Sequence, residues 1–187
     1  MWLNSGLEIL EFCNMKPQLL VAERKGGRIM PIETTNISAH THPTVAQAMY
    51  QCVAETAVTT MMAQNFHWNV TGMAFGPLHA LFQDIYEDHF QAQDELAERI
   101  RSMGHSVDGR LSAMIDVSKV IEDPEGFSKN DKEMVTALAE AQKTLAATLA
   151  GAGDIAAANG DKLTEDLCVE RGRVHEKFSW LLQSHVS

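Results

Sequence analysis

The feature that most constrains the fold is a helical pattern that runs without interruption from Leu78 to Met103. Its apolar residues return every three or four positions, which is the spacing of one face of an α-helix. Gly104 follows directly, and glycine suits the left-handed conformation just beyond a helix end. The row consists of Leu78, Leu81, Phe82, Ile85, Ala92, Leu96 and Ile100, with His89 among them. A helix of this length with one apolar face predicts a fold made by packing long helices together.

A second helical segment precedes this one. It opens at Pro43, whose fixed backbone angle suits a helix start, and it ends at Thr71-Gly72. Its expected apolar stripe is formed by Val45, Met49, Cys52, Val53 and Met61.

Two more helical segments lie in the second half of the chain. Ser128 with Asp131 resembles a capping box and is expected to begin the first of them, whose end Gly151 and Gly153 loosen. The last segment starts between Asp161 and Thr164. The apolar row of the first of these segments contains Val135, Leu138, Leu145 and Leu149, with Gln142 among them. The apolar row of the last segment contains Leu167, Val174, Phe178, Leu181 and Leu182.

The order of these segments predicts the architecture. Residues 105–127 form a long connection with room for a short helix at about 111–120. No stretch shows sustained two-residue alternation, so we expect no sheet. Four long helices, with a short helix in the crossover between the second and third, predict an all-α, ferritin-like four-helix bundle. We expect residues 41–187 to form this domain and residues 1–40 to form an N-terminal extension.

Composition excludes several classes of function. The net charge of −10 and the sequence pI near 5.2 oppose attraction to nucleic acid or anionic lipid and favour the collection of cations. No segment has the ~20 apolar residues that a membrane-spanning helix needs, and the first residues make a poor secretory signal. Three cysteines without metal-type spacing indicate reduced thiols. We expect a soluble cytoplasmic protein.

Four residues have the character of metal ligands. His67 and His79 flank the turn at Gly72, so one chain can bring them together, and Asp94 and Glu98 are neighbours on one helical face. Imidazole with carboxylates suits iron and also accepts zinc or manganese. However, the helical rise places Asp94 ~22 Å from His79, whereas a metal–ligand bond is ~2 Å long. If all four are ligands, the site must be shared between two copies of the chain.

Each of these residues also has a simpler interpretation. A histidine at a helix end often caps the helix or satisfies a polar neighbour. Asp94 and Glu98 also fit a solvated helix face, with Glu98 paired to Arg99 or Arg101.

The sequence segments around these residues resemble those of a known protein family. Residues 66–72, Phe-His-Trp-Asn-Val-Thr-Gly, and the segments Leu78-His79 and 96–100 resemble the Dps family, the mini-ferritins named as DNA-binding proteins from starved cells. Residues 160–167 and the segment His175-Glu176-Lys177 resemble the last helix of the family. The resemblance covers residues 43–185 and implies a protein of the bacterial cytoplasm or nucleoid.

The resemblance implies a hollow homododecamer that acts as a ferroxidase. In the family, Fe(II) is oxidised, preferentially by hydrogen peroxide, at centres that lie across two-fold interfaces, and ferric mineral is stored inside. On the matching positions, one subunit supplies His67 and His79, and its partner supplies Asp94 and Glu98.

The resemblance also gives expectations for other positions. Gln83 stands where the family usually has an acidic residue, so it is expected to be a weaker ligand of a second iron. Trp68 is either a core aromatic or, as in the family, a trap for radicals beside the iron. Asp161 and Asp166 are expected to line pores, although their place at the start of a helix also explains them. An acidic cluster is expected to nucleate mineral, although it also fits a solvated helix face. The cluster consists of Asp84, Glu87 and Asp88.

Two other classes of function remain alternatives. A DNA-condensing protein is disfavoured, because the first forty residues are neutral and no Lys or Arg follows Trp180. A metal-free helical scaffold would require the four-residue pattern to be accidental.

Overall fold

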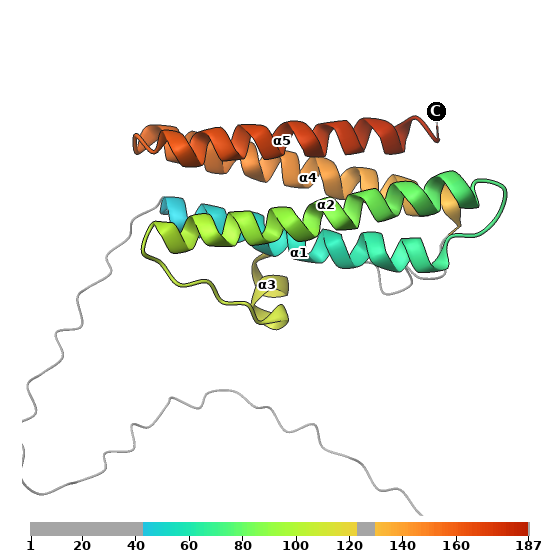
Figure 1. Ribbon diagram of the computed structural model, residues 1–187, viewed down its shortest axis with the longest axis horizontal. Coiled ribbons are helices and arrows are strands. Elements are labelled where there is room, and N and C mark those ends of the chain that lie inside the picture. Colours follow the sequence, from blue (N-terminus) through green and yellow to red (C-terminus); the bar gives the residue numbers. More distant parts are fainter. Residues whose placement is uncertain (1–42, 123–129, 187) are drawn as a thin grey trace, which may run out of the picture. The chain divides into compact units, whose positions relative to one another are not determined.

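The computed structural model describes residues 43–122 and 130–186, which contain five α-helices and no β-strand (Figure 1). The helices are α1 (Val45–Asn69), α2 (Phe75–Ser102), α3 (Leu111–Val117), α4 (Asp131–Ala158) and α5 (Lys162–Gln183). The predicted all-α fold, with four long helices and a short helix in the crossover, is confirmed. The expected extension, residues 1–40, lies outside the described residues.

The four long helices form two hairpins that pack against each other. The pairs α1 with α2 and α4 with α5 make the most extensive contacts, and α1 also packs on α4. The helices α2 and α5 approach each other at few places. The short α3 contacts α1 and lies on the side of the first hairpin away from α4 and α5 (Figure 1). As a result, α1 is covered by three other helices.

The central part of α1 is buried around its whole circumference. Residues 52–60 are all buried, which is possible because α2, α3 and α4 surround them. Thr56, Thr59 and Thr60 donate their hydroxyls to carbonyl oxygens four residues earlier, at 2.7–2.8 Å, so these polar groups are satisfied within the helix. The prediction of a single buried stripe on this helix is wrong at its last residue, because Met61 is 45% exposed.

Two of the long helices, α1 and α4, begin at capping boxes. Before α1, the backbone N–H of Gln47 donates to the Thr44 hydroxyl, and the Thr44 N–H donates to the Gln47 side chain. Before α4, Asn130 and Glu133 form the same reciprocal pair, with both hydrogen bonds at 3.0 Å. The expected box of Ser128 with Asp131 is therefore wrong by two residues. Ser128 itself lies outside the described residues.

The second helix matches its predicted pattern. The row from Leu78 to Ile100 faces the core, and only Leu81 in it is partly rather than fully buried. Gly104 follows with φ of +88°, as expected of a glycine just past a helix end. Because no residue breaks α2 between Phe75 and Ser102, it acts as one continuous spacer.

Gly153 is a point of close contact rather than the loose helix end that was expected. The helix α4 continues to Ala158, and Gly153 is buried. A Cβ atom added there would lie 3.3 Å from the Cβ of Cys168, a free and buried thiol on α5. The missing side chain thus allows α4 and α5 to approach closely.

Gly153→Ala and Gly151→Ala are a matched pair of variants that test this contact. Each replaces a helical glycine by the best helix former, which is worth about 1 kcal/mol. A Cβ at Gly151 would meet no atom within 4 Å, whereas overpacking at Gly153 should cost about 1–3 kcal/mol. In urea unfolding, we expect Gly151→Ala to raise the free energy of unfolding and Gly153→Ala to leave it unchanged or lower it. Equal stabilisation by both would show that the contact is not tight.

Candidate metal centre

The turn between α1 and α2 brings His67 and His79 face to face. His67 lies in the last turn of α1 and His79 in the second turn of α2, and Gly72 reverses the chain between them with φ of +91°. Their imidazole rings stack with centroids 3.7 Å apart and planes inclined by 18°. Both histidines are partly buried. The structure thus joins the two predicted histidine ligands within one chain.

Reciprocal hydrogen bonds fix the orientation of both rings. The Nδ1 of His67 lies 2.8 Å from the carbonyl oxygen of His79, and the Nδ1 of His79 lies 2.8 Å from the carbonyl oxygen of His67. Because a carbonyl oxygen only accepts hydrogen bonds, each Nδ1 must carry the proton and donate. In the neutral ring, Nε2 then carries the lone pair. A neutral imidazole with a free Nε2 is the form of histidine that binds a metal ion.

Two aromatic side chains pack around the histidine pair. The ring of Tyr86 meets His67 edge-on with centroids 5.3 Å apart, and the ring of Phe75 stacks on His79 at 4.9 Å. The residue pattern assigned neither aromatic side chain a role at the site. Phe75 precedes His79 by four residues and Tyr86 follows it by seven. This helical spacing is the signal that could have placed both aromatic rings beside His79.

Asp94 and Glu98 lie elsewhere on the chain. Both are exposed on α2, beyond the midpoint of that helix, and its rise puts Asp94 ~22 Å from His79. Within residues 43–122 and 130–186, no three His, Cys, Asp or Glu side chains gather closely enough to hold a metal ion. Within one chain the four predicted ligands therefore form two separated pairs, a histidine pair and a carboxylate pair, which we call the half-sites of the predicted centre.

The proposed arginine partners of Glu98 make their contacts with other groups. Arg99 donates to Asp161 and to the hydroxyl of Thr164, both at 2.8 Å. Arg101 donates to the carbonyl oxygen of His105 at 2.9 Å.

Gln83 lies one helical turn after His79 and is partly buried. Its amide donates to the carboxylate of Glu87 at 2.7 Å, which leaves the amide oxygen as the group with free lone pairs. The neighbouring Asp84 is exposed and turned about 100° around the helix. An oxygen near the histidine pair is thus present, but it is neutral.

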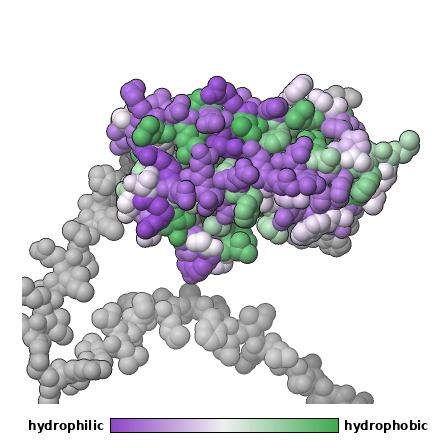
Figure 2. Space-filling view, viewed as in Figure 1, coloured by the Kyte–Doolittle hydropathy of each residue, from purple (hydrophilic) through white to green (hydrophobic). Residues whose placement is uncertain are grey.

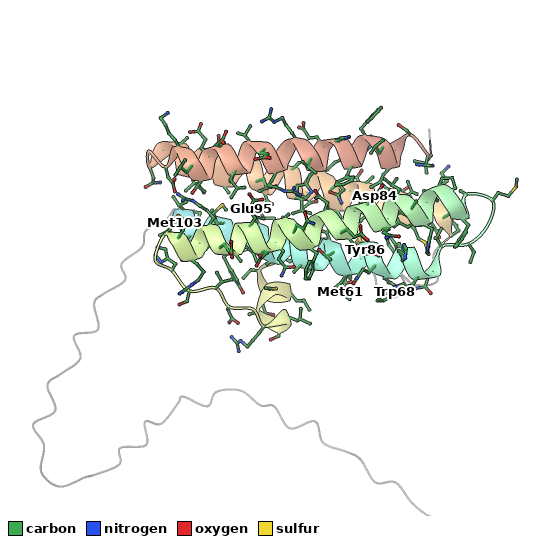
Figure 3. The ribbon with its side chains drawn as sticks, in the orientation of Figure 1. Met61, Trp68, Asp84, Tyr86, Glu95 and Met103 are labelled. Atoms are coloured by element: carbon green, nitrogen blue, oxygen red, sulfur yellow. The ribbon has the colours of Figure 1, made fainter. Side chains whose placement is uncertain are left out.

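Trp68 is 65% exposed in the single chain, so the core interpretation of this aromatic is wrong. Figure 3 shows Trp68, Tyr86 and Met61 along the α1–α2 hairpin, away from α4 and α5. The indole therefore lies on the same hairpin as the histidine half-site.

Comparison with known proteins places this geometry in a family. A family model described as a ferritin-like domain matches residues 46–187. The chain is 31% identical to the DNA protection during starvation protein of Helicobacter pylori over 134 residues, 72% of this chain and 92% of that protein. The chain belongs to the Dps family of ferritin-like proteins.

Solved structures agree with this assignment. Dps from Staphylococcus aureus is similar with a TM-score of 0.73 and 32% identity, over 76% of this chain and 95% of that one. A Dps protein from Vibrio cholerae O1, described as a member of a broad superfamily of ferritin-like diiron-carboxylate proteins, gives a TM-score of 0.72 and 27% identity. That match covers 76% of this chain and 89% of the Vibrio chain. Among the described residues of this Dps-family chain, no helix is long and apolar enough to span a membrane.

Two of the acidic residues expected at pores or at the inner wall are already paired. Asp161 caps α5 by accepting hydrogen bonds from Thr164, and it pairs with Arg99 at 2.8 Å. The hydrogen bonds from Thr164 lower the pKa of Asp161 most, and the charge of Arg99 lowers it further. Asp88 accepts two hydrogen bonds from Arg171, so it is not part of a solvated face. By contrast, Asp84, Glu87 and Asp166 are exposed.

A buried polar network crosses the centre of the bundle. Gln142 on α4 accepts a hydrogen bond from Nδ1 of His175 at 2.8 Å and donates to Nε2 of His89 at 3.0 Å. The Nδ1 of His89 lies 3.4 Å from Asp88, too far for a good hydrogen bond, and the Nε2 of His175 has no protein partner. Local spacing placed His89 in the core row but gave no sign of its partners on α4 and α5.

The network holds two neutral histidines. Burial lowers the pKa of His89, which the neighbouring Asp88 only partly offsets. Burial also lowers the pKa of His175 well below its ordinary value, and the nearby His89 and Arg171 lower it further. Although burial raises the pKa of Asp88, the nearby His89 ring and the hydrogen bonds and charge of Arg171 outweigh this effect and hold that pKa far below its usual range.

The metal-free protein should consequently lose stability in mild acid. The unfolded chain binds protons on these histidines below about pH 6.5, whereas the folded chain does so only at lower pH. Stability should be full above this pH and should fall below it, by up to about 2.7 kcal/mol per pH unit for two protons. Unfolding in urea between pH 7.5 and 5.5 measures this slope, and His175→Gln should roughly halve it. A flat profile would contradict the assignment of two neutral histidines.

Proposed function

We propose that this Dps-family chain is a mini-ferritin that oxidises Fe(II) at centres shared between two subunits and stores the ferric product. His67 and His79 of one subunit bind the iron together with the partner's Asp94 and Glu98. The observation that carries this proposal is the orientation of the histidine pair. Both imidazoles are locked with Nε2 free, yet among the described residues their own chain brings no carboxylate to them and offers only the neutral amide oxygen of Gln83.

The names of similar proteins agree with an iron-dependent protective function. The relative from Helicobacter pylori is named for DNA protection during starvation, and the Vibrio protein is described as ferritin-like and diiron-carboxylate. Iron storage and stress protection are therefore the broad functions that this family membership supports.

The proposed ligand set suits oxidation of the bound iron. Neutral imidazoles bind Fe²⁺ without adding charge, and the anionic carboxylates favour the more highly charged Fe³⁺. With hydrogen peroxide as oxidant, two Fe²⁺ ions give one electron each, and peroxide takes up two protons to form two molecules of water. Removing Fe(II) and peroxide together prevents the formation of hydroxyl radical. Trp68, exposed next to His67, is placed to intercept radicals that escape.

The surface of the chain supports assembly. Four large apolar side chains are exposed around the α1–α2–α3 face: Met61 (45%), Ile115 (60%), Leu111 (67%) and Phe90 (72%). Figure 2 shows apolar patches interrupting a mostly hydrophilic face, one of them over α3. A second copy of the chain would cover this face and supply the missing carboxylates, and closure into a homododecamer follows the family pattern.

Exposed acidic residues fit the remaining parts of a storage shell. Asp166 on α5 is unpaired in the described chain and suits a pore that attracts Fe²⁺. Asp84 suits an inner wall where mineral nucleates, whereas Glu87 lies on the α1–α2–α3 face and is less suitable. Asp161 and Asp88 are less suitable, because Arg99 and Arg171 already balance their charges.

DNA condensation remains the alternative that the names of the relatives raise. The net charge of −10 opposes it, because binding to phosphate depends on Lys and Arg side chains. Beyond Trp180 the chain carries no such residue.

Gln83→Asp should strengthen iron binding at a second position beside the histidine pair. It places an anionic oxygen one turn from His79, where Gln83 offers a neutral one. Titration calorimetry with Fe²⁺ under anaerobic conditions should show tighter binding or an additional site. Glu87→Gln is a control that changes charge on the same helix without creating this ligand. Unchanged affinity and stoichiometry in Gln83→Asp would mean that this side chain does not face the metal.

A mixed assembly tests whether the site is divided between subunits. One variant carries His67→Ala and His79→Ala, and the other carries Asp94→Ala and Glu98→Ala. Each alone should form shells that lack rapid peroxide-driven iron oxidation. In a mixed dimer, one site combines both damaged halves and the other combines both intact halves.

After unfolding and random reassembly, half of the dimers are mixed, so about a quarter of wild-type activity should return. Light scattering must show that both variants and the mixture keep the mass of the wild-type assembly. No recovery in a normally assembled mixture would contradict a shared site.

A further inference from the structure

An apolar groove lies on the face that carries the half-sites. Its volume is about 500 Å³, and α1, α2 and α3 all contribute to it, with Ala57, Thr60, Met61, Tyr86, Phe90 and Leu111 among the lining residues. Phe90 stands at its edge with 72% of its surface exposed. A large aromatic beside an apolar groove is rarely left in water on a soluble protein.

The proposed site fixes how two copies of α2 must pair. Tyr86, Phe90 and Asp94 fall within an arc of about 80° that includes His79, since each residue turns the helix by about 100°. If His79 of one copy meets the partner's Asp94 and Glu98, the two α2 helices run antiparallel about a two-fold axis. That axis passes halfway between position 79 and positions 94–98, which is close to residues 86–88.

The same pairing places Phe90 opposite a defined part of the partner. Phe90 lies a few residues after the axis, so it faces positions an equal number of residues before it. These are positions 83–87 of the second copy, which include two residues of the groove lining, Tyr86 and Glu87. Helices that pack in this way have axes about 8–10 Å apart, a distance that a phenyl ring can bridge.

We infer that Phe90 of each subunit inserts into the α1–α2–α3 groove of its partner and acts as a positioning residue for the shared iron site. The inference rests on the proposed division of that site. The occupant of the groove is therefore a second copy of this chain, with two Phe90 side chains in each two-fold contact.

The insertion also explains the position of Tyr86. Its ring contacts His67 edge-on on one side and lines the groove on the other. An inserted phenyl ring presses Tyr86 against the histidine pair and excludes water from that side. The same contact fixes the position along α2 at which the partner's Asp94 arrives. Phe90 thus acts through the subunit contact and does not touch iron.

Cross-linking without iron tests the pairing of the helices. Glu87 lies near the axis on the facing side of α2, so Glu87→Cys should place two thiols opposite each other. In a Cys13→Ser background, mild oxidation should give covalent dimers on a non-reducing gel. Asp84→Cys is the matched control, because Asp84 is an equally acidic and exposed residue that lies about three residues from the axis and is turned about 60° further from the facing side of the helix. Equal cross-linking of both variants, or none in Glu87→Cys, would overturn the inference.

Removal of the phenyl ring tests the insertion itself. In Phe90→Ala, the concentration at which the assembly dissociates in sedimentation experiments should rise at least about a hundredfold, since each two-fold contact loses two buried rings. Phe90→Leu should restore most of the loss. Leu163→Ala is the matched control, because Leu163 is 71% exposed but lies on α5, away from the groove. Wild-type dissociation in Phe90→Ala would contradict the insertion.

These measurements separate the inference from the proposed function. Efficient Glu87→Cys cross-linking in a protein that does not oxidise iron would contradict only the proposed function. Iron oxidation that depends on all four ligands, without Glu87→Cys cross-links, would contradict only the inserted Phe90.

Discussion

The uninterrupted course of α2 is the constraint on which the functional account depends. A helix without a break from Phe75 to Ser102 holds His79 and Asp94 ~22 Å apart, and no side-chain movement closes such a gap. The short turn at Gly72 has the opposite effect, because it forces His67 against His79. Together they give the chain a histidine half-site and a distant carboxylate half-site, which the proposed centre combines by pairing two chains.

The interior of the bundle shows why the metal is not expected within one chain. Larger ferritins build such sites from inward-facing Glu and His side chains on facing helices. Here the corresponding space is occupied by His89, Gln142 and His175, which bond to one another, and by the ion pair of Asp88 with Arg171. Buried polar groups that satisfy one another stabilise a single arrangement of helices. Long polar side chains therefore fill the space between α2 and α5, two helices that approach each other at few places.

Much of the fold could be predicted from local spacing. The apolar row of α2 and the glycine after it are local signals, and so is the short helix α3, which ends at Val117 rather than near residue 120. The all-round burial of α1 could not be predicted in this way, because spacing reports burial of one face and not coverage by three helices. The start of α4 was misplaced because Ser128 and Asn130 are both good caps, and only Asn130 has Glu133 three residues on.

The candidate site shows the same division. The types and spacing of His67, His79, Asp94 and Glu98 are local, so the sequence sufficed to propose them and to require two chains. The hydrogen bonds from Nδ1 of His67 and of His79 to backbone carbonyl oxygens depend on the geometry of the turn. That geometry cannot be predicted from the residue pattern. Asp88 and Asp161 were expected at the inner wall and the pores, but their arginine partners lie 83 and 62 residues away in the chain. Such long-range pairing leaves no periodic signal.

The most direct test of the shared site is anomalous diffraction at the iron edge from crystals of the assembled protein soaked in Fe²⁺. The account predicts one strong peak beside each histidine pair, bounded by Nε2 of His67 and of His79 and by the partner's Asp94 and Glu98. The two peaks of a dimer should lie about 22 Å apart, because α2 separates them. A peak inside the bundle near His89 and His175, or one bounded only by residues of a single chain, would contradict the account.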